Sequence, residues 1–206
     1  MNRTGLAVCS WLLLVAGGFG LLTRYSLQAG DAVGVLATWP VESRIPYSRD
    51  GMTLVVFLHP HCACSHATVE ELSKLQSPEA FASLVPVFYR PSSAPPSWIE
   101  TGLWRRVVDL ADSNSHVDVD ATEAKRFGVT TSGHCLLFDR AGRRLFSGGV
   151  TISRGHEGQS IARLNLDRLL RGERFECQEY PVFGCPIVSQ PTSETGSGLA
   201  GNLSAE

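Results

Sequence analysis

The sequence predicts an α/β fold in which a mixed sheet is flanked by helices. Short β-rich runs alternate with segments whose apolar residues recur at helical spacing, which is typical of a sheet covered on both faces. The run Met52–Leu58 lacks the apolar–polar alternation of a half-exposed strand, so it is expected to be buried on both faces. Late in the chain, Leu136–Phe138 and Arg143–Ser147 flank a four-residue turn, which predicts an antiparallel hairpin at one edge.

The other elements follow from the same patterns along the chain. An amphipathic helix is expected after Ser65, because Val69, Leu72 and Leu75 fall on one helical face. The further expected elements are a strand at Val85–Tyr89, a helix at Trp98–Leu110, a short strand at Val117–Val119, a helix at Ala121–Phe127 and a closing helix at Gln159–Arg171 that stops at Gly172.

Length and composition indicate one globular domain with an appendage at each end. The chain has 206 residues, of which 43% are hydrophobic and 18% charged. A formal net charge of -2 gives no basic field, so nucleic acid is not an expected partner. The expected parts are an anchor at 1–23, a tether at 24–50, the folded domain at 51–188 and a small, polar, disordered tail at 189–206.

The amino terminus carries an uncharged apolar run, Leu6–Leu22, between Arg3 and Arg24. Its 17 residues reach the lower limit for a membrane-spanning helix, about 17–25 residues. A cleaved signal peptide is the alternative, but a cleavage site near Ala29 would place the bulky Leu27 at its third position back. The prediction is an uncleaved, single-pass anchor with the domain outside the cytoplasm.

The segment after the first core strand holds a cysteine that is suited to nucleophilic chemistry. Cys62 would begin a helix, where free backbone N–H groups and the helix dipole favour a thiolate. His59, His61 and His66 would add positive neighbours. Cys62 is therefore expected to be the most acidic and most exposed thiol, and the attacking sulfur of a redox site.

Cys64 decides which redox chemistry is open to Cys62. A disulfide between cysteines with one residue between them is strained and easily reduced, which favours an oxidant or an isomerase-like role. Alternatively, Cys62 acts alone and Ser65 caps the helix.

The remaining cysteines have structural interpretations. Cys177 and Cys185 enclose a short loop, and a disulfide between them is expected in an oxidising compartment. They are alternatively an exchange partner for Cys62. Cys9 lies in the apolar run and Cys135 in an expected strand, so both are interpreted as buried apolar residues.

The order of elements, with a cysteine pair between the first core strand and its helix, resembles the thioredoxin superfamily. In this resemblance Cys62 takes the first cysteine of the Cys-x-x-Cys motif, Ser65 falls at the second, and Cys64 comes one residue early. Gly133 stands where thioredoxins carry the cis-proline that faces the reactive cysteine. The resemblance implies exchange with protein thiols or disulfides through Cys62 and Cys64, without a cofactor.

A narrower resemblance is to a bacterial group of thioredoxin-like proteins called RedB-like. The stretches that carry it are Phe57–Ser65, Thr131–His134, Phe146–Gly149 and Val182–Pro186. This resemblance, together with the apolar run, implies a bacterial inner-membrane protein whose domain faces the periplasm or the cell exterior.

Soft-metal binding is the alternative function for the same residues. Thiolates and imidazoles suit copper(I) or zinc, and Cys62, Cys64 and His134 would be the ligands, joined by His61 or His66. The spacing matches no standard zinc signature, so redox chemistry is preferred. A non-catalytic binding module is the third hypothesis, because a fold does not fix a function.

Overall fold

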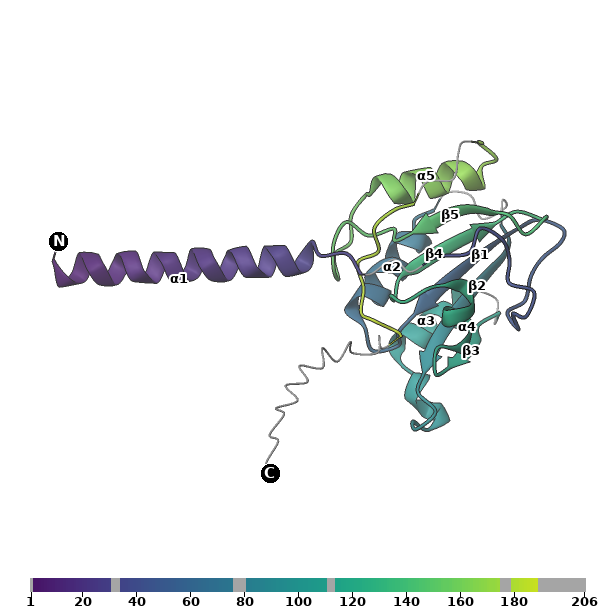
Figure 1. Cartoon of the computed structure of the whole chain (residues 1–206), viewed down its shortest axis with the longest axis horizontal. Helices are drawn as coiled ribbons and strands as arrows, with labels where there is room; N and C mark the ends of the chain where they lie inside the picture. The colour runs from purple at the N-terminus through teal and green to yellow at the C-terminus, as the bar shows by residue number, and fades with distance from the viewer. Residues whose placement is uncertain (1, 31–33, 76–80, 111–113, 175–178, 189–206) are drawn as a thin grey trace, which may run out of the picture.

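A five-stranded mixed sheet with the strand order β3-β2-β1-β4-β5 forms the centre of the domain (Figure 1). The computed structural model describes residues 2–30, 34–75, 81–110, 114–174 and 179–188. The strands are β1 (Met52–Leu58), β2 (Phe81–Arg90), β3 (His116–Val119), β4 (His134–Phe138) and β5 (Arg144–Gly148). β1, β2 and β3 run parallel, β4 pairs antiparallel with β1, and β5 pairs antiparallel with β4. The predicted fold class is confirmed.

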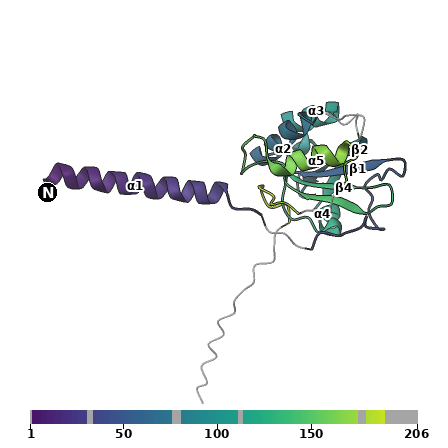
Figure 2. The ribbon, with the colours of Figure 1, turned by 90° about the horizontal axis from the view of Figure 1, so that it is seen from above.

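Helices cover both faces of this sheet (Figure 2). Those on one face are α2 (Ala63–Ser73), α3 (Gly102–Leu110) and α5 (Ile161–Leu170), and α4 (Thr122–Phe127) lies on the other. The two apolar clusters share β1, which contributes Leu54 to one and Phe57 to the other. Every residue of β1 from Thr53 onward is buried, because strand neighbours and helices surround it. β1 is therefore the two-faced core strand that its apolar run predicted.

The helix expected at Trp98–Leu110 is broken into two pieces. A 3-10 turn, η2 (Pro96–Ile99), is followed by non-helical backbone at Glu100, and α3 begins only at Gly102. The Pro95–Pro96 pair explains the early start, since proline favours the first turn of a helix and cannot donate a backbone hydrogen bond.

Part of the segment expected to be a tether packs on the domain. The ring of Trp39 lies 5.1 Å from the rings of both Phe127 and Phe138, and Ile45 is buried in the same cluster. This segment therefore covers the sheet beside α4. The expected disordered tail, 189–206, lies outside the described residues.

The amino-terminal helix α1 (Arg3–Ser26) projects away from the domain as a single rod (Figure 1). It has 24 residues and none of them is buried. At about 1.5 Å per residue such a helix is roughly 36 Å long, and the hydrocarbon core of a bilayer is about 30 Å thick. Its length and composition suffice to cross a membrane, and they also fit a signal sequence.

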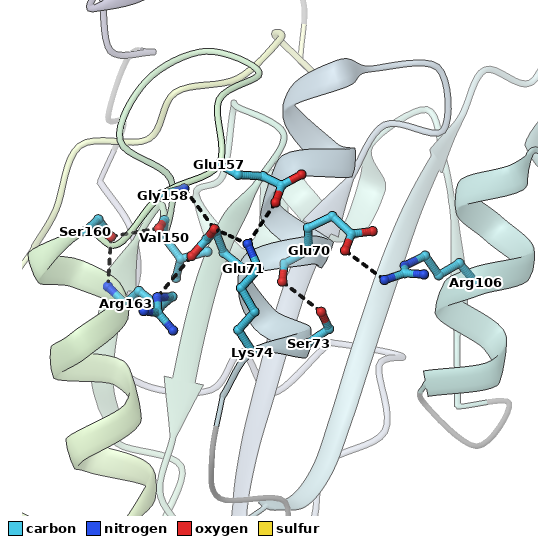
Figure 3. Close-up of polar contacts among 10 residues, drawn as sticks. All are labelled: Glu70, Glu71, Ser73, Lys74, Arg106, Val150, Glu157, Gly158, Ser160 and Arg163. Atoms are coloured by element: carbon cyan, nitrogen blue, oxygen red, sulfur yellow. Dashed lines mark hydrogen bonds and ion pairs between the residues drawn. The ribbon is translucent and has the colours of Figure 1, made fainter.

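A buried carboxylate joins α2 to the segment before α5 (Figure 3). Glu71 is 1% exposed, and its carboxylate accepts hydrogen bonds from Lys74 Nζ at 2.8 Å and from the Gly158 backbone N–H at 2.9 Å. It also forms an ion pair with Arg163 at 3.0 Å. These contacts fix the helix whose N-cap is Cys62.

Candidate active site

Cys62 is positioned by the turn between β1 and α2. It is the N-cap of α2, with extended backbone, and its N–H donates to the His59 carbonyl oxygen at 3.1 Å. Ser65 Oγ accepts a hydrogen bond from the His59 N–H at 2.9 Å. Ser65 is therefore not the helix cap; it braces the turn that presents Cys62.

Three thiols meet at this helix start. The Sγ atoms of Cys62, Cys64 and Cys185 all lie within 4.8 Å of one another. The Sγ atoms of Cys62 and Cys185 are 2.7 Å apart, although the two residues are separated by 123 positions in the sequence. The third thiol comes from residues 182–188, which we call the Cys185 segment.

The Cys185 segment is hydrogen-bonded to the loop before β4. The Ser132 N–H donates to the Cys185 carbonyl oxygen at 2.9 Å, and the Cys185 N–H donates to Ser132 Oγ at 3.0 Å. Two residues further on, the Ile187 N–H donates to the Thr130 carbonyl oxygen at 2.8 Å. Because the backbone on both sides of Cys185 is fixed, its side chain is held over Cys62.

Gly184 allows the closest approach in this pairing. A Cβ atom at Gly184 would lie 1.9 Å from the Ser132 carbonyl oxygen, so no larger residue fits without moving the backbone. The Arg154 guanidinium donates to the Gly184 carbonyl oxygen and, at 3.2 Å, to that of Gln28. The Arg154 side chain also lies 5.1 Å from the ring of Tyr25, so it connects the Cys185 segment to the end of α1.

Hydrogen bonds from neighbouring groups stabilise the thiolate of Cys62. The Cys64 thiol lowers the pKa of Cys62 most, and the Cys185 thiol, the Ser132 hydroxyl and the Ser65 backbone N–H lower it further, so that together they outweigh burial. The pKa of Cys64 is raised by its hydrogen bond to Cys62 and by burial. Burial and Cys62 likewise raise the pKa of Cys185. These directions favour a thiolate at Cys62 and protonated thiols at Cys64 and Cys185.

The expectation that Cys62 is the most exposed thiol is wrong. Its exposed fraction is 3% and that of Cys64 is 6%, because the Cys185 segment covers both. Cys185 is only partly buried, so it is the most exposed residue of the cluster.

Among the described residues, the imidazoles of His61 and His66 form no hydrogen bond with the thiol cluster. His61 and His66 are exposed, and His61 Nε2 lies 2.9 Å from the Trp98 carbonyl oxygen. Burial lowers the pKa of His59, which favours its neutral form. The groups that form hydrogen bonds with Cys62 are two thiols, a hydroxyl and a backbone N–H.

The predicted ligand His134 lies outside the thiol cluster. It is buried, and its Nε2 lies 2.9 Å from Ser147 Oγ. Burial, helped by the nearby Arg144, lowers the pKa of His134 to about 4. Cys185, and not His134, is the third potential metal ligand.

Gly133, which stands where thioredoxins carry the cis-proline, packs against Thr68 of α2. Its φ of +84° is in the left-handed region, and a Cβ there would lie 2.7 Å from Thr68 Oγ1. The residue that faces Cys62 is Ser132, whose Oγ donates to Cys62 Sγ at 3.5 Å.

The other cysteines lie apart from the cluster. Cys135 is fully buried in β4, and burial raises its pKa. Cys9 is exposed on α1. Cys177 lies outside the described residues, and Cys185, which was expected to pair with it, is a free thiol that lies beside Cys62.

The strand order, the antiparallel pair β4–β5 and a cysteine at the start of the helix after the central strand decide the fold. The chain has a thioredoxin-like fold. No family model matches its sequence, and no curated protein matches it. The chain is similar to several solved structures.

A hypothetical protein from Sinorhizobium meliloti 1021 is 21% identical, with a TM-score of 0.50 over 79% of this chain and 94% of that chain. An uncharacterized conserved protein from Geobacillus kaustophilus is 16% identical, with a TM-score of 0.48 over 81% and 95% of the two chains. A secreted Mycobacterium tuberculosis disulfide oxidoreductase, homologous to E. coli DsbE, is 14% identical, with a TM-score of 0.38 over 60% and 82%. At these identities the thioredoxin-like likeness concerns the fold alone, and the RedB-like group stays a prediction.

Proposed function

We propose that this chain is a membrane-anchored, extracytoplasmic thiol–disulfide exchange protein whose attacking sulfur is Cys62. The observation that carries the proposal is the convergence of three thiols at the start of α2, within 4.8 Å of one another, where hydrogen bonds lower the pKa of Cys62. A thiolate is the nucleophile of disulfide exchange, and a second thiol nearby completes the reaction. The partners are proteins that carry thiols or disulfides.

The reaction proceeds in two balanced steps. The Cys62 thiolate attacks one sulfur of a partner disulfide, so that a mixed disulfide forms while the partner's own S–S bond breaks and its departing sulfur takes up a proton. A second thiol of the cluster then loses its proton and attacks the Cys62 sulfur. The partner's remaining sulfur leaves as a thiolate, and a disulfide closes within the chain. The partner gains two electrons and the chain loses two; the reverse sequence oxidises a partner dithiol.

Cys64 supports the first step as a hydrogen-bond donor. Its thiol stays protonated beside Cys62, because the hydrogen bond to Cys62 raises the pKa of Cys64. A hydrogen bond to the charged form stabilises that form, so Cys64 keeps Cys62 ready to attack.

The test is a turnover assay with the full chain in detergent micelles, a thiol reductant and a fluorogenic peptide disulfide. We expect Cys62→Ser to abolish turnover, because it removes the nucleophile. Cys135→Ser is the matched control, since Cys135 is a fully buried thiol in β4 away from the cluster, and it should retain activity. Equal turnover by wild type and Cys62→Ser would overturn the proposal, and no turnover by either would favour a non-catalytic binding module.

A second candidate function is soft-metal binding by the same thiols. The observation in its favour is the convergence of three sulfur atoms, a ligand type that suits copper(I) and zinc. Copper(I) titration of the reduced chain against a competing chelator tests it. Binding that is lost in Cys185→Ser and unchanged in His134→Gln would support this function, because only the first change removes a sulfur from the cluster.

A further inference from the structure

We infer that Cys185, and not Cys64, closes the disulfide with Cys62, so that the Cys185 segment supplies the second reacting thiol of the site. This inference rests on the exchange reaction proposed above. It assigns the second thiol to a residue 123 positions away from the first, instead of to the same helix turn.

The distance between the two sulfur atoms favours Cys185. The Sγ atoms of Cys62 and Cys185 are 2.7 Å apart. A disulfide bond is about 2.05 Å long, so closure needs a movement of less than about 1 Å. The Cys185 sulfur therefore already lies beside the atom that it must attack.

The geometry of a disulfide between Cys62 and Cys64 is less favourable. Cys62 and Cys64 are separated by one residue, and Cys64 lies inside the first turn of α2, where the backbone is helical. Disulfides have narrow limits on the separation and torsion of their atoms, and departures from these limits store strain. A bond from Cys62 to Cys185 closes no such small ring.

Hydrogen bonds and close packing fix the Cys185 segment in this position. Ser132 bonds to both the N–H and the carbonyl oxygen of Cys185, and Gly184 packs against Ser132 so closely that a Cβ atom would meet its carbonyl oxygen at 1.9 Å. Arg154 holds the carbonyl oxygen of Gly184. A thiol that is fixed in this way attacks at a high effective concentration.

The electrostatics of the cluster change in favour of Cys185 once a partner is bound. Cys62 raises the pKa of Cys185 while it carries a negative charge, whereas Arg154 and the hydrogen bond from Cys64 lower it. A mixed disulfide at Cys62 has no charge, so only burial still opposes the thiolate of Cys185. Cys185 then loses its proton and attacks Cys62 Sγ, and the partner's sulfur leaves and is protonated.

Peptide mapping of the oxidised full chain tests this assignment. The reduced chain in detergent micelles is treated with glutathione disulfide, quenched in acid and digested with trypsin without reductant. Cleavage after Arg49, Lys74 and Arg174 places Cys62 and Cys64 in peptide 50–74 and Cys185 in peptide 175–206. We expect a disulfide that joins these two peptides, and it should persist in Cys177→Ser.

The kinetics of single variants identify the attacking thiol. In Cys185→Ser the adduct of glutathione on Cys62 should accumulate and decay at least about tenfold more slowly than in wild type, because no thiol displaces the glutathione. In Cys64→Ser the adduct should still be resolved. Gly184→Ala keeps all thiols but displaces the segment, so it should slow closure; Gly102→Ala is its control, because an added Cβ there meets nothing within 4 Å.

Four results would overturn the inference. A disulfide within peptide 50–74, or accumulation of the adduct in Cys64→Ser instead of Cys185→Ser, would assign the second thiol to Cys64 and leave the proposed exchange reaction intact. A disulfide between Cys177 and Cys185 would also overturn the inference alone. Failure of Cys62 to form any adduct with glutathione would overturn both the inference and the proposed function.

Discussion

The charge on Cys62 is stabilised by groups that donate hydrogen bonds, with the Cys64 thiol as the largest contributor. We therefore predict that the rate of iodoacetamide modification of Cys62, followed by peptide mass mapping, is nearly constant between about pH 6 and 8 in the reduced chain. The modification rate of an ordinary thiol, with a pKa of about 8.5, would fall about tenfold for each unit by which the pH is lowered in that range.

The control for this prediction is Cys64→Ala. It removes the strongest donor, so it should raise the pKa of Cys62 and make its modification rate depend on pH. A wild-type rate that falls as steeply as that of a free thiol would contradict the assignment of the thiolate.

His134 makes the stability of the domain depend on pH. Its pKa is lowered to about 4 by burial, whereas an unfolded histidine has a pKa of about 6.5. Between these values the unfolded chain binds a proton that the folded chain does not, so stability falls as the pH drops below about 6.5. The free energy of unfolding should decrease by about 2 kcal/mol between pH 7 and pH 5.

Urea unfolding of the full chain in micelles, followed by tryptophan fluorescence, measures this change. His134→Gln should reduce the decrease, because glutamine does not titrate. An equally large decrease in the variant would show that another group is responsible.

Helix α2 is fixed at its far end by Glu71, which bonds to Lys74 at the end of the same helix and to Gly158 and Arg163 of the segment that leads into α5 (Figure 3). Glu71→Gln keeps the size of the side chain but removes its charge, leaving Arg163 without its anionic partner. We expect the free energy of unfolding to fall by about 1–3 kcal/mol, the cost of leaving a buried charged group imperfectly paired.

Glu70→Gln is the matched control on the same helix. Glu70 pairs with Arg106, whose side chain is 50% exposed, so this change should cost less than about 1 kcal/mol. Equal losses in the two variants, measured by urea unfolding, would refute the role given to Glu71.

At the level of elements, sequence patterns predict what depends on local composition. The uninterrupted apolar run of β1 is long enough to specify a two-faced strand, and its bounds are confirmed. The break between η2 and α3 was missed, because apolar spacing continues through Glu100 although the backbone there is not helical.

Only the part of the site formed by residues close together in the sequence could be predicted. A cysteine after a core strand and before an amphipathic helix is a local pattern, and it identified Cys62 and Cys64. The contact of Cys62 with Cys185 depends on the path of the chain after α5, which no spacing rule gives. The interpretation of Cys185 as an exchange partner, and the stretch Val182–Pro186, were the only signals of this contact in the sequence.

For the whole molecule, the thiol cluster lies close to the end of α1. Arg154 contacts both the end of α1 and the Cys185 segment, and the Gly30 N–H donates to the Val182 carbonyl oxygen at 2.8 Å. If α1 spans the bilayer, the reacting sulfurs lie near the membrane surface, within reach of cysteines in neighbouring membrane proteins.

The anchor is tested by fractionation and intact-mass measurement. We expect the chain to stay in the membrane fraction after a carbonate wash, with a mass that includes α1. Replacing Leu13 and Leu14 together by arginine should release it, since each arginine at the centre of a spanning helix costs about 2.5–3.5 kcal/mol. A soluble wild-type form that begins near residue 30 would show that α1 is a cleaved signal.

The claim that Cys62 is the exchanging sulfur is tested most directly by redox equilibrium with glutathione. The full chain in micelles is equilibrated at a series of ratios of reduced to oxidised glutathione, quenched in acid and alkylated, and the fraction of alkylated Cys62 is measured. We expect one two-electron transition in which Cys62 and Cys185 become protected from alkylation together, while Cys135 remains a free thiol throughout. Cys62 that stays free at every ratio, including a large excess of glutathione disulfide, would contradict the claim.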